Sequence, residues 1–384
     1  MLLIKNGLVF TMENEEPEYS DILIKNQKIE KIGENIDATE NTCVIDAKGK
    51  MIFPGFIDAH SHLGICEEKA TAQVDESNEN TTPVTPTVRA IDGINPMDSA
   101  FHNALASGIT GVMVGPGSAN PIGGQFAFVK TYGRCIDDML VLAPSAIKTA
   151  FGENPMTNYG INGNPPSCRM GIASFIREEL FRAKQYFDNE TEDTQKDFSL
   201  ECYRKLFLGE IPLKAHVHRA DDILTAIRIA KEFNLGLTLD HCTEGHLIAD
   251  EIKKSGYPAI VGPSLASRNK KEVSQSDFKT AGVLKKEGVT VALTTDHPVS
   301  RIQYLPLCAG LAAKEGLGEY NALRAITIDA ASICRVDDRV GSLKAGKDAD
   351  IVILDGNPLE IKTNVEMTII NGEIVWERKT EASV

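Results

Sequence analysis

The sequence lacks the features of membrane proteins and of small secreted ones. It contains no run of about 18 apolar residues, so neither a transmembrane helix nor a membrane partner is expected. Its 8 cysteines include no CxxC pair, and in a chain of this size they are interpreted as reduced thiols of a cytoplasmic protein. The opening MLLIKNGLVFTMENEE has no basic segment before a long apolar core and no small-residue cleavage site, so it predicts a strand and not a signal peptide.

Basic residues are also in deficit. The 40 lysines and arginines are outnumbered by 54 aspartates and glutamates, which gives a net charge of −14. This balance argues against nucleic acid or an anionic membrane as a partner. With 384 residues, of which 42% are hydrophobic and 24% charged, the composition is that of an ordinary globular protein with one large domain or two.

Both ends of the chain have the pattern of short strands joined by turns. LLIKNGLVF, DILIKNQKIEKIG and CVIDAKGKMIFPG near the start, and VEMTIINGEIVWE near the end, group apolar residues around NG, NQ and KG turns. We therefore expect residues 1–54 and 341–384 to form one small β-sandwich domain from the two termini.

The segment 55–340 alternates apolar strands with amphipathic helices. A strand at 213–216, for example, precedes a helix predicted over 221–233 by apolar residues at helical spacing. Repeated units of this kind predict an α/β fold of the (β/α)8 TIM-barrel type. An open doubly wound sheet is the alternative, but no GxGxxG follows an early strand. The stretch 152–209 interrupts the pattern and is predicted to be an insertion, a long loop with helices that covers the mouth of the barrel.

Histidines recur in pairs two residues apart. His60 and His62 follow the apolar run MIFPGFID, and His216 and His218 end the strand in PLKAHVH. Chance would give about 0.15 such pairs in a chain with 8 histidines. Because side chains i and i+2 of a strand point to one face, each pair is placed to bind one metal ion.

Two further strands end in residue types that bind metals. His241 ends LTLDH and Asp296 ends VALTTD. In a barrel the carboxyl ends of the strands meet on one face, where active sites are built. Singly, His241 could be a hydrogen-bonded structural residue and Asp296 could cap a turn. Together with the two pairs they form a histidine-rich set with one carboxylate, which suits zinc or another borderline divalent metal.

These motifs resemble those of the amidohydrolase superfamily. The matching segments are PGFIDAHSH, the histidine of KAHVH, the DH of LTLDH, TTDH, and the tail GSLKAGKDADIVILDGNP, and they span nearly the whole chain. Within the superfamily the chain is most similar to the imidazolonepropionase-related amidohydrolases, through DESNENTTPVTPTVRAIDGINP and PGSANPIGGQ.

The resemblance implies a role for each residue. His60, His62 and His216 would be metal ligands, and His241 would bind metal directly or through a water. Asp296 would contact the metal and take the proton of the attacking water, which makes Asp296 and His241 the catalytic pair. His218 would contact the substrate or support the ligands. One or two divalent transition metals are implied, with zinc favoured over manganese or iron.

A second metal would need one more ligand. Many relatives carry a carboxylated lysine on the fourth strand, and Lys148 in LAPSAIKTAF stands at the matching place. A lysine after an apolar run is otherwise costly to bury, unless it is partly exposed at the strand end. Glu153 lies five residues further on and is the rival for this role.

Substrate contacts are expected in the loops that follow the strands. Ser118 and Asn120 offer polar groups in GPGSANPIGG, where glycines let backbone amides approach a ligand, although the segment could equally be a tight structural turn. Arg219 could pair with a substrate carboxylate or make a local ion pair, and Arg268 has the same two alternatives.

The sequence thus predicts a metal-dependent hydrolase that cleaves a non-peptide C–N bond, such as that of a cyclic amide, in a small molecule. A dipeptidase or N-acyl-amino-acid hydrolase, or a deaminase of the same superfamily, is the enzymatic alternative. A non-catalytic barrel used in assembly is the alternative of another class, although such proteins usually lose ligands and all the expected positions are filled here. The resemblance also favours a homo-oligomer.

Overall fold

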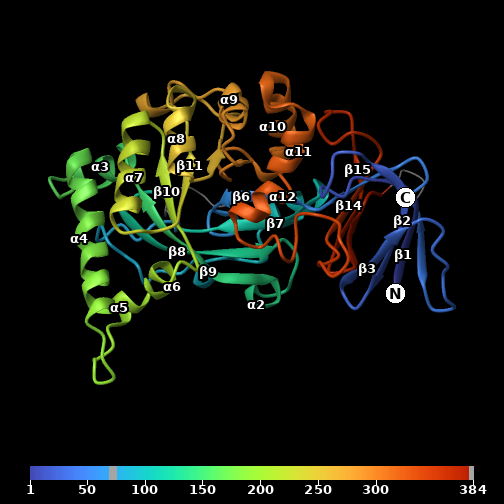
Figure 1. Ribbon diagram of the computed structural model, residues 1–384, viewed down its shortest axis with the longest axis horizontal. Helices are drawn as coiled ribbons and strands as arrows, with labels where there is room; N and C mark the ends of the chain where they lie inside the picture. The colour runs from blue at the N-terminus through green and yellow to red at the C-terminus, as the bar shows by residue number, and fades with distance from the viewer. Residues whose placement is uncertain (69–75, 380–384) are drawn as a thin grey trace.

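The computed structural model describes residues 1–68 and 76–379 of the chain. They form a helix-covered barrel and a smaller all-β part (Figure 1). Residues 380–384 of the expected sandwich segment, and Asp75 at the start of DESNEN, lie outside the described residues. None of the described helices combines the length and the hydropathy that a bilayer crossing requires.

The all-β part is the predicted sandwich of strands from both termini. Its order is β16-β15-β14-β5-β1-β2-β3, and β4 pairs with the half of β1 that β5 leaves uncovered. Isoleucines from both ends of the chain, among them Ile22, Ile52 and Ile351, are fully buried in its core. The strands are β1 (Leu2–Val9), β2 (Glu18–Lys25), β3 (Lys28–Gly33), β4 (Cys43–Asp46), β5 (Met51–Pro54), β14 (Ile351–Leu354), β15 (Val365–Ile370) and β16 (Glu373–Glu377).

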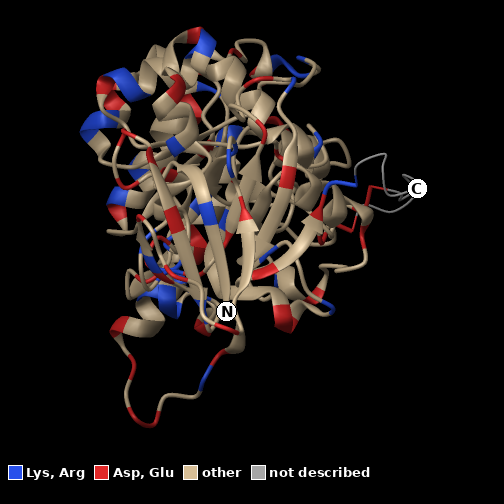
Figure 2. Cartoon of the chain, turned by 90° about the vertical axis from the view of Figure 1, so that its right-hand side faces the viewer, with Lys and Arg blue, Asp and Glu red and all other residues tan. Residues whose placement is uncertain are grey.

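Figure 2 faces this sandwich and shows both acidic and basic residues on its strands. One such pair, Lys50 and Glu366, joins the two ends of the chain with a nitrogen–oxygen distance of 3.1 Å.

The eight strands of the barrel follow one another in space in the order of the sequence. They are β6 (Phe56–Ser61), β7 (Ile109–Val114), β8 (Ile122–Lys130), β9 (Leu140–Ala150), β10 (Leu213–Val217), β11 (Leu237–His241), β12 (Ala259–Val261) and β13 (Val291–Leu293). The two edges meet through hydrogen bonds from Thr294 Oγ1 to the His60 carbonyl (2.5 Å) and from Thr295 N to the Asp58 carboxylate (3.0 Å). The TIM-type fold is therefore confirmed.

One strand departs from the expected all-parallel arrangement. β8 is antiparallel to both β7 and β9. The connections on either side of β8 are short, at residues 115–121 and 131–139, and the second holds only the one-turn α2 (Ile136–Met139). Neither provides the crossover helix that a parallel pair needs, so the chain turns back on itself.

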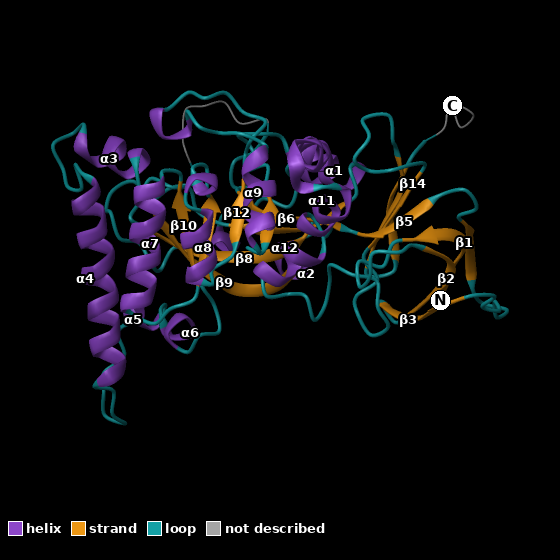
Figure 3. Ribbon diagram, turned by 45° about the horizontal axis from the view of Figure 1, so that its top comes forward, coloured by secondary structure: helices purple, strands orange, loops and turns teal. Residues whose placement is uncertain are grey.

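Helices cover the outside of the barrel, whereas the sandwich consists of strands and loops (Figure 3). The helices are α1 (Ser99–Ala106), α3 (Glu153–Gly160), α4 (Arg169–Asp188), α5 (Phe198–Glu201), α6 (Arg204–Phe207), α7 (Ala220–Glu232), α8 (Ala249–Ser255), α9 (Lys279–Glu287), α10 (Leu305–Ala312), α11 (Glu319–Ala325) and α12 (Ile328–Ile333). Single turns are η1 (Ala90–Asp92), η2 (Gly245–Leu247), η3 (Lys271–Val273), η4 (Ile302–Tyr304) and η5 (Ala313–Leu317).

The expectation that 152–209 covers the mouth of the barrel is only partly right. α3 reaches the mouth, where the Tyr159 hydroxyl donates to the Thr82 carbonyl (2.7 Å). The longer α4 instead lies beside α7 on the outside of the barrel (Figures 1 and 3). Its Ile172, Ile176 and Leu180 recur at helical spacing and are fully buried, which gives α4 an apolar stripe that packs on the barrel.

Candidate metal and substrate site

The side chains that the motifs single out gather at the carboxyl ends of four barrel strands. They are His60 and His62 at β6, His216 and His218 at β10, His241 at β11 and Asp296 beyond β13. All are buried, with exposures from 0% at His60 to 9% at His62. Their ligand atoms form two groups, His60 with His62 and Asp296, and His216 with His218 and His241, and within each group these atoms all lie within 4.8 Å of one another.

The two groups are neighbours. The ring centroids of His60 and His241, one from each group, are 4.9 Å apart. Asp296 Oδ1 lies 3.5 Å from His60 Nε2 and 3.4 Å from His62 Nε2. The six residues therefore lie together at one end of the barrel.

The backbone takes an uncommon conformation at two of these residues. His241 has φ +68° and Asp296 has φ +52°, both in the left-handed region that side chains other than glycine rarely adopt. At His241 the strand pattern ends, and as a result Asp240 and His241, although adjacent in sequence, both reach His60. Such conformations cost free energy and are concentrated at functional sites.

Hydrogen bonds hold four of the imidazoles through Nδ1. His60 Nδ1 lies 2.5 Å from Asp240 Oδ2, and His62 and His241 donate to the carbonyls of Gly115 and Gly262, each at 2.8 Å. His218 Nδ1 is 2.8 Å from Thr243 Oγ1. Fixing Nδ1 in this way directs the Nε2 atoms to one another, an arrangement typical of metal-binding histidines.

Several atoms facing this site are buried without a hydrogen-bond partner. They are His60 Nε2, His241 Nε2, Asp296 Oδ1 and Lys148 Nζ. Leaving a buried polar atom unpaired costs about 1–3 kcal/mol. Three of these four atoms are of the types that bind transition metals, so the residues present fit a divalent metal ion.

The electrostatics favour the forms that bind metals. Burial is the main reason why the pKa values of His60, His216 and His218 lie well below the usual range for histidine. Burial alone would raise the pKa of Asp296, but His241 and other neighbouring groups lower it below its usual value. Neutral imidazoles and an ionised carboxylate are the required states of these ligands.

Lys148 lies on β9 and is fully buried, with its Nζ 5.4 Å from the centroid of the Phe126 ring. Burial lowers the pKa of Lys148 to about 8. A second buried lysine, Lys214, differs because it donates to the Ala59 carbonyl (2.9 Å) and lies 3.0 Å from Asp240 Oδ2. The rival Glu153 begins α3 and is neither in a ligand group nor at the wall of the pocket.

A pocket of about 280 Å³ opens on the ligands. Ser118 lies in its wall and accepts a hydrogen bond from Asn154 Nδ2 (2.6 Å). A larger cavity of about 480 Å³, between the barrel and the sandwich, contains none of the candidate ligands.

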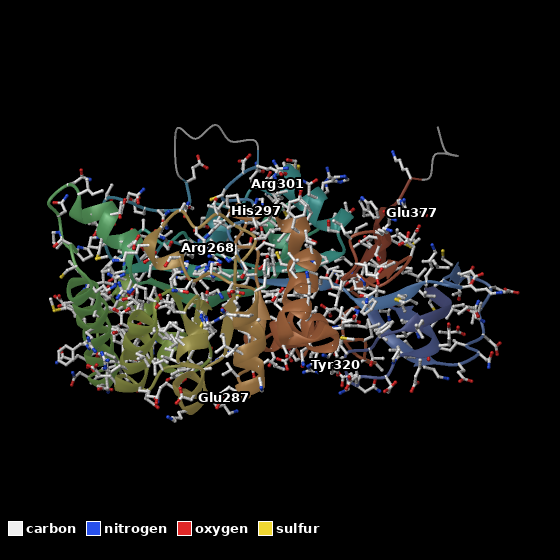
Figure 4. All side chains as sticks on the ribbon, turned by 90° about the horizontal axis from the view of Figure 1, so that it is seen from above. Arg268, Glu287, His297, Arg301, Tyr320 and Glu377 are labelled. Carbon is white, nitrogen blue, oxygen red and sulfur yellow. The ribbon has the colours of Figure 1, made fainter. Side chains whose placement is uncertain are left out.

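His218 also lines this pocket, whereas Asn120, Arg219 and Arg268 do not. Asn120 is buried beneath it and donates to the Glu79 carbonyl (2.8 Å) and Thr85 Oγ1 (3.0 Å). Arg219 makes the local ion pair, with both nitrogen–oxygen distances to Asp221 at 2.9 Å. Arg268, labelled on the barrel part in Figure 4, donates to a backbone carbonyl at 2.6 Å.

Sequence reasoning missed three residues of the site. Asp240 was overlooked because strand alternation turns it away from His241, and only the left-handed backbone brings both inward. Asn154 and Lys270 lie in the pocket wall but come from a helix start and a long loop. The DH pair in LTLDH could have signalled Asp240, whereas nothing in the sequence marks Lys270.

Comparisons with known proteins indicate the family of the chain. The amidohydrolase family matches residues 256–376. The crystal structure of an amidohydrolase from Thermotoga maritima is similar over 98% of this chain and 100% of that one, with a TM-score of 0.95 and 41% identity.

Curated relatives are more distant. Amidohydrolase tasK of Hapsidospora irregularis is 26% identical over 94% of the chain, which spans 41% of that protein's length. Imidazolonepropionase of Treponema denticola is 27% identical over 87% of this chain and 85% of its own. A 5'-deoxyadenosine deaminase of Methanobrevibacter smithii is 21% identical over 98% and 93%, respectively.

Proposed function

The chain belongs to the amidohydrolase superfamily, and from this premise we propose that it is a metal-dependent hydrolase that cleaves a non-peptide C–N bond of a small molecule. The observation that carries the proposal is the set of buried, unpaired atoms at the strand ends, His60 Nε2, His241 Nε2 and Asp296 Oδ1. Without a bound cation these atoms would be a net cost to folding.

The two ligand groups support one or two metal ions. His60, His62 and Asp296 would hold one, and His216 and His241 would hold a second, with His218 as a further ligand or a substrate contact. Zinc suits these ligands best, and manganese and iron share the same preferences. When bound, a divalent metal lowers the pKa of water at the site and polarises the carbonyl group of the substrate.

Asp296 is the proposed proton carrier. Its Oδ1 faces the pocket between His60 and His62 and has no hydrogen bond, and it is ionised at neutral pH. It would accept the proton of the attacking water and then donate it to the leaving nitrogen. Where His218 is not a metal ligand, its Nε2–H would donate to the negative oxygen of the tetrahedral intermediate, with Nδ1 bonded to the Thr243 hydroxyl.

Lys148 is the proposed bridge between two metals, as a carbamate. Its neutral amine would attack carbon dioxide, forming an N–C bond and releasing the amine proton to solvent. The product is an acidic group in place of a buried, unpaired ammonium. The pKa of about 8, caused by burial, supports this chemistry because a sizeable fraction of the amine is neutral near that pH.

A cyclic amide is the substrate class we favour, because the chain is similar to an imidazolonepropionase over 87% of its length. The similarity to a deaminase favours a second candidate, hydrolytic release of ammonia at the same site. Assembly into a homo-oligomer and a cytoplasmic location stay predictions.

The proposal is tested by metal content and turnover together. Purified protein is loaded with Zn²⁺ or Mn²⁺ and dialysed, and bound metal is counted by mass spectrometry; we expect one or two ions per chain. The double variant His60→Ala/His216→Ala should bind far less, whereas His102→Ala, at a histidine outside both groups, should bind as wild type does. Loaded protein is then given cyclic amides, hydantoins, N-acyl amino acids, dipeptides and aminopurines. Ammonia release would select the deaminase, and a protein that binds no metal would refute the proposal.

A further inference from the structure

Lys270 brings a positive charge to the wall of the candidate substrate pocket. It lies in the loop between β12 and η3, and it lines the pocket together with His216, His218 and Asp296. We propose that Lys270 binds a carboxylate of the substrate, so that the substrate is a compact amide that carries a free carboxylate. This inference rests on the proposed function and adds the chemical class of its substrate.

The ammonium of Lys270 has no acidic partner in the described part of the chain. Its hydrogen bond goes to a neutral acceptor, Asn154 Oδ1, and none of the ion pairs among described residues includes it. By contrast, Arg219 is paired with Asp221. A lysine in a pocket with no counterion of its own can bind an anionic group without breaking an existing pair.

The nearest carboxyl group along the chain does not neutralise Lys270. Glu272 is 1% exposed and does not line the pocket. There it accepts a hydrogen bond from Glu153 N (2.7 Å) and lies 3.9 Å from Arg169 Nη2. Burial raises the pKa of Glu272, and the N–H of Glu153 and the charge of Lys270 oppose this effect without an ion pair between Glu272 and Lys270.

Lys270 is close to the candidate catalytic groups. Its partner Asn154 also reaches Ser118 Oγ at 2.6 Å and His216 Nε2 at 3.4 Å. After burial and the charge of His241, the ammonium of Lys270 contributes to the low pKa of His218. A substrate whose carboxylate is bound to Lys270 would therefore have room for only a few covalent bonds between that carboxylate and an amide group that lies against His216 and His218.

The remaining wall of the pocket suits a small polar molecule. The volume of about 280 Å³ is at the lower end of what small-molecule sites offer. Hydroxyl and amide side chains other than the candidate ligands line it: Ser118, Asn154, Thr243, Ser267, Asn269 and Ser276. They provide donors for the second carboxylate oxygen and leave little room for a long apolar tail.

The first test uses substrates in pairs. Each cyclic amide or N-acyl amino acid is offered to the zinc-loaded protein as the free acid and as its primary carboxamide. We expect kcat/KM to be at least about tenfold higher for the acid, the size of one hydrogen bond between charged groups. In Lys270→Met, KM for the acid should rise about tenfold with kcat little changed, since this contact holds substrate and transition state alike.

The second test measures binding and does not depend on turnover. Succinate and succinamide are titrated calorimetrically into metal-free and zinc-loaded protein. Wild type should bind succinate at least about tenfold more tightly than succinamide, and Lys270→Met should remove this preference in both forms. Lys270→Arg keeps the charge and should retain part of it. The matched control is Lys271→Met, at an exposed neighbour outside the pocket, which should behave as wild type.

The outcomes separate this inference from the proposed function. If no substrate of the panel is hydrolysed but Lys270→Met loses succinate binding, the proposed function fails and the carboxylate site stands. If amides are hydrolysed but acids have no advantage, or if the advantage persists in Lys270→Met, the inference about Lys270 is overturned and the hydrolase stands.

Discussion

Lys130 joins the barrel to the sandwich, and replacing it by methionine should weaken the whole molecule. The residue ends β8, and its buried ammonium donates to Asp348 Oδ2 (2.8 Å), Asp350 Oδ1 (3.0 Å) and Asn371 Oδ1 (2.5 Å). Methionine keeps the length and the apolar stem of the side chain but removes the charge. The main effect of Lys130→Met is therefore the loss of one cation from a buried cluster.

The expected loss of folding stability in Lys130→Met depends on which partners Asp348 and Asp350 retain. Asp348 still has Arg339 at 2.8 Å and a contact with Lys28. Asp350 keeps the backbone N–H of Asn371 at 2.9 Å but loses its cation. Removing one partner of a buried ion pair costs about 3–5 kcal/mol, and since Asp348 is partly compensated we expect about 3 kcal/mol here.

The loss should also depend on pH. Burial raises the pKa of Asp350 even in the wild type, where Lys130 opposes that effect. Without Lys130 the folded-state pKa would be higher still, and a raised carboxyl pKa destabilises the folded state above that pKa. The deficit of Lys130→Met should thus be larger at pH 8 than at pH 5.

Urea denaturation measures the deficit, because the single tryptophan, Trp376, lies in β16 of the sandwich. Circular dichroism follows the helices of the barrel in the same samples. The double variant Lys130→Met/Asp350→Asn should recover at least about 1 kcal/mol, because it removes the stranded charge. Lys50→Met, which breaks a half-exposed pair, is the control and should cost at most about 1 kcal/mol. A Lys130→Met variant as stable as this control would refute the reasoning.

Three further predictions concern the site. Asp296→Asn should lower kcat by about 10²–10⁴-fold while the urea midpoint stays within error, and turnover close to wild type would exclude Asp296 as the proton carrier. Lys148→Met should reduce the metal content by one ion per chain and abolish the carbamate signal that ¹³C-bicarbonate gives in the NMR spectrum of wild type; a wild type without that signal contradicts the carbamate. Asp240→Asn should weaken metal binding about 10–100-fold in a chelator competition, because Asp240 orients His60. Unchanged metal affinity would mean that Asp240 serves only as the ion-pair partner of Lys214.

Much of the fold was predictable from local patterns. The alternation of apolar residues and the turn residues predicted the strands of both termini, and the helical spacing near 221–233 predicted α7 (Ala220–Glu232). Patterns of this kind report which face of an element is buried, whatever its partner. They do not report direction, and so β8 was expected to be parallel. They also could not show that the insertion helix α4 packs on the outer wall, because its apolar stripe suits either location.

Some residues of the site could likewise be predicted from the sequence and others could not. His60, His62, His216, His241 and Asp296 could be named from the sequence because each ends an apolar strand, and parallel strands of a barrel end on one face. Spacing along a strand and the topology together determine where such residues converge. The loops obey no comparable rule. Of the predicted contacts, Asn120 proved to be bonded to the distant Thr85, and Arg219 to its neighbour Asp221.

The sequence by itself determined the type of chemistry, through residue types that suit a divalent metal at the ends of strands. Only the tertiary structure decided which charges face the substrate. Asp240 and His241 are adjacent in sequence, yet both reach His60, because the backbone at His241 is left-handed, and Lys270 lines the pocket from the loop after β12. Both placements depend on contacts between segments distant in sequence, which no local pattern encodes.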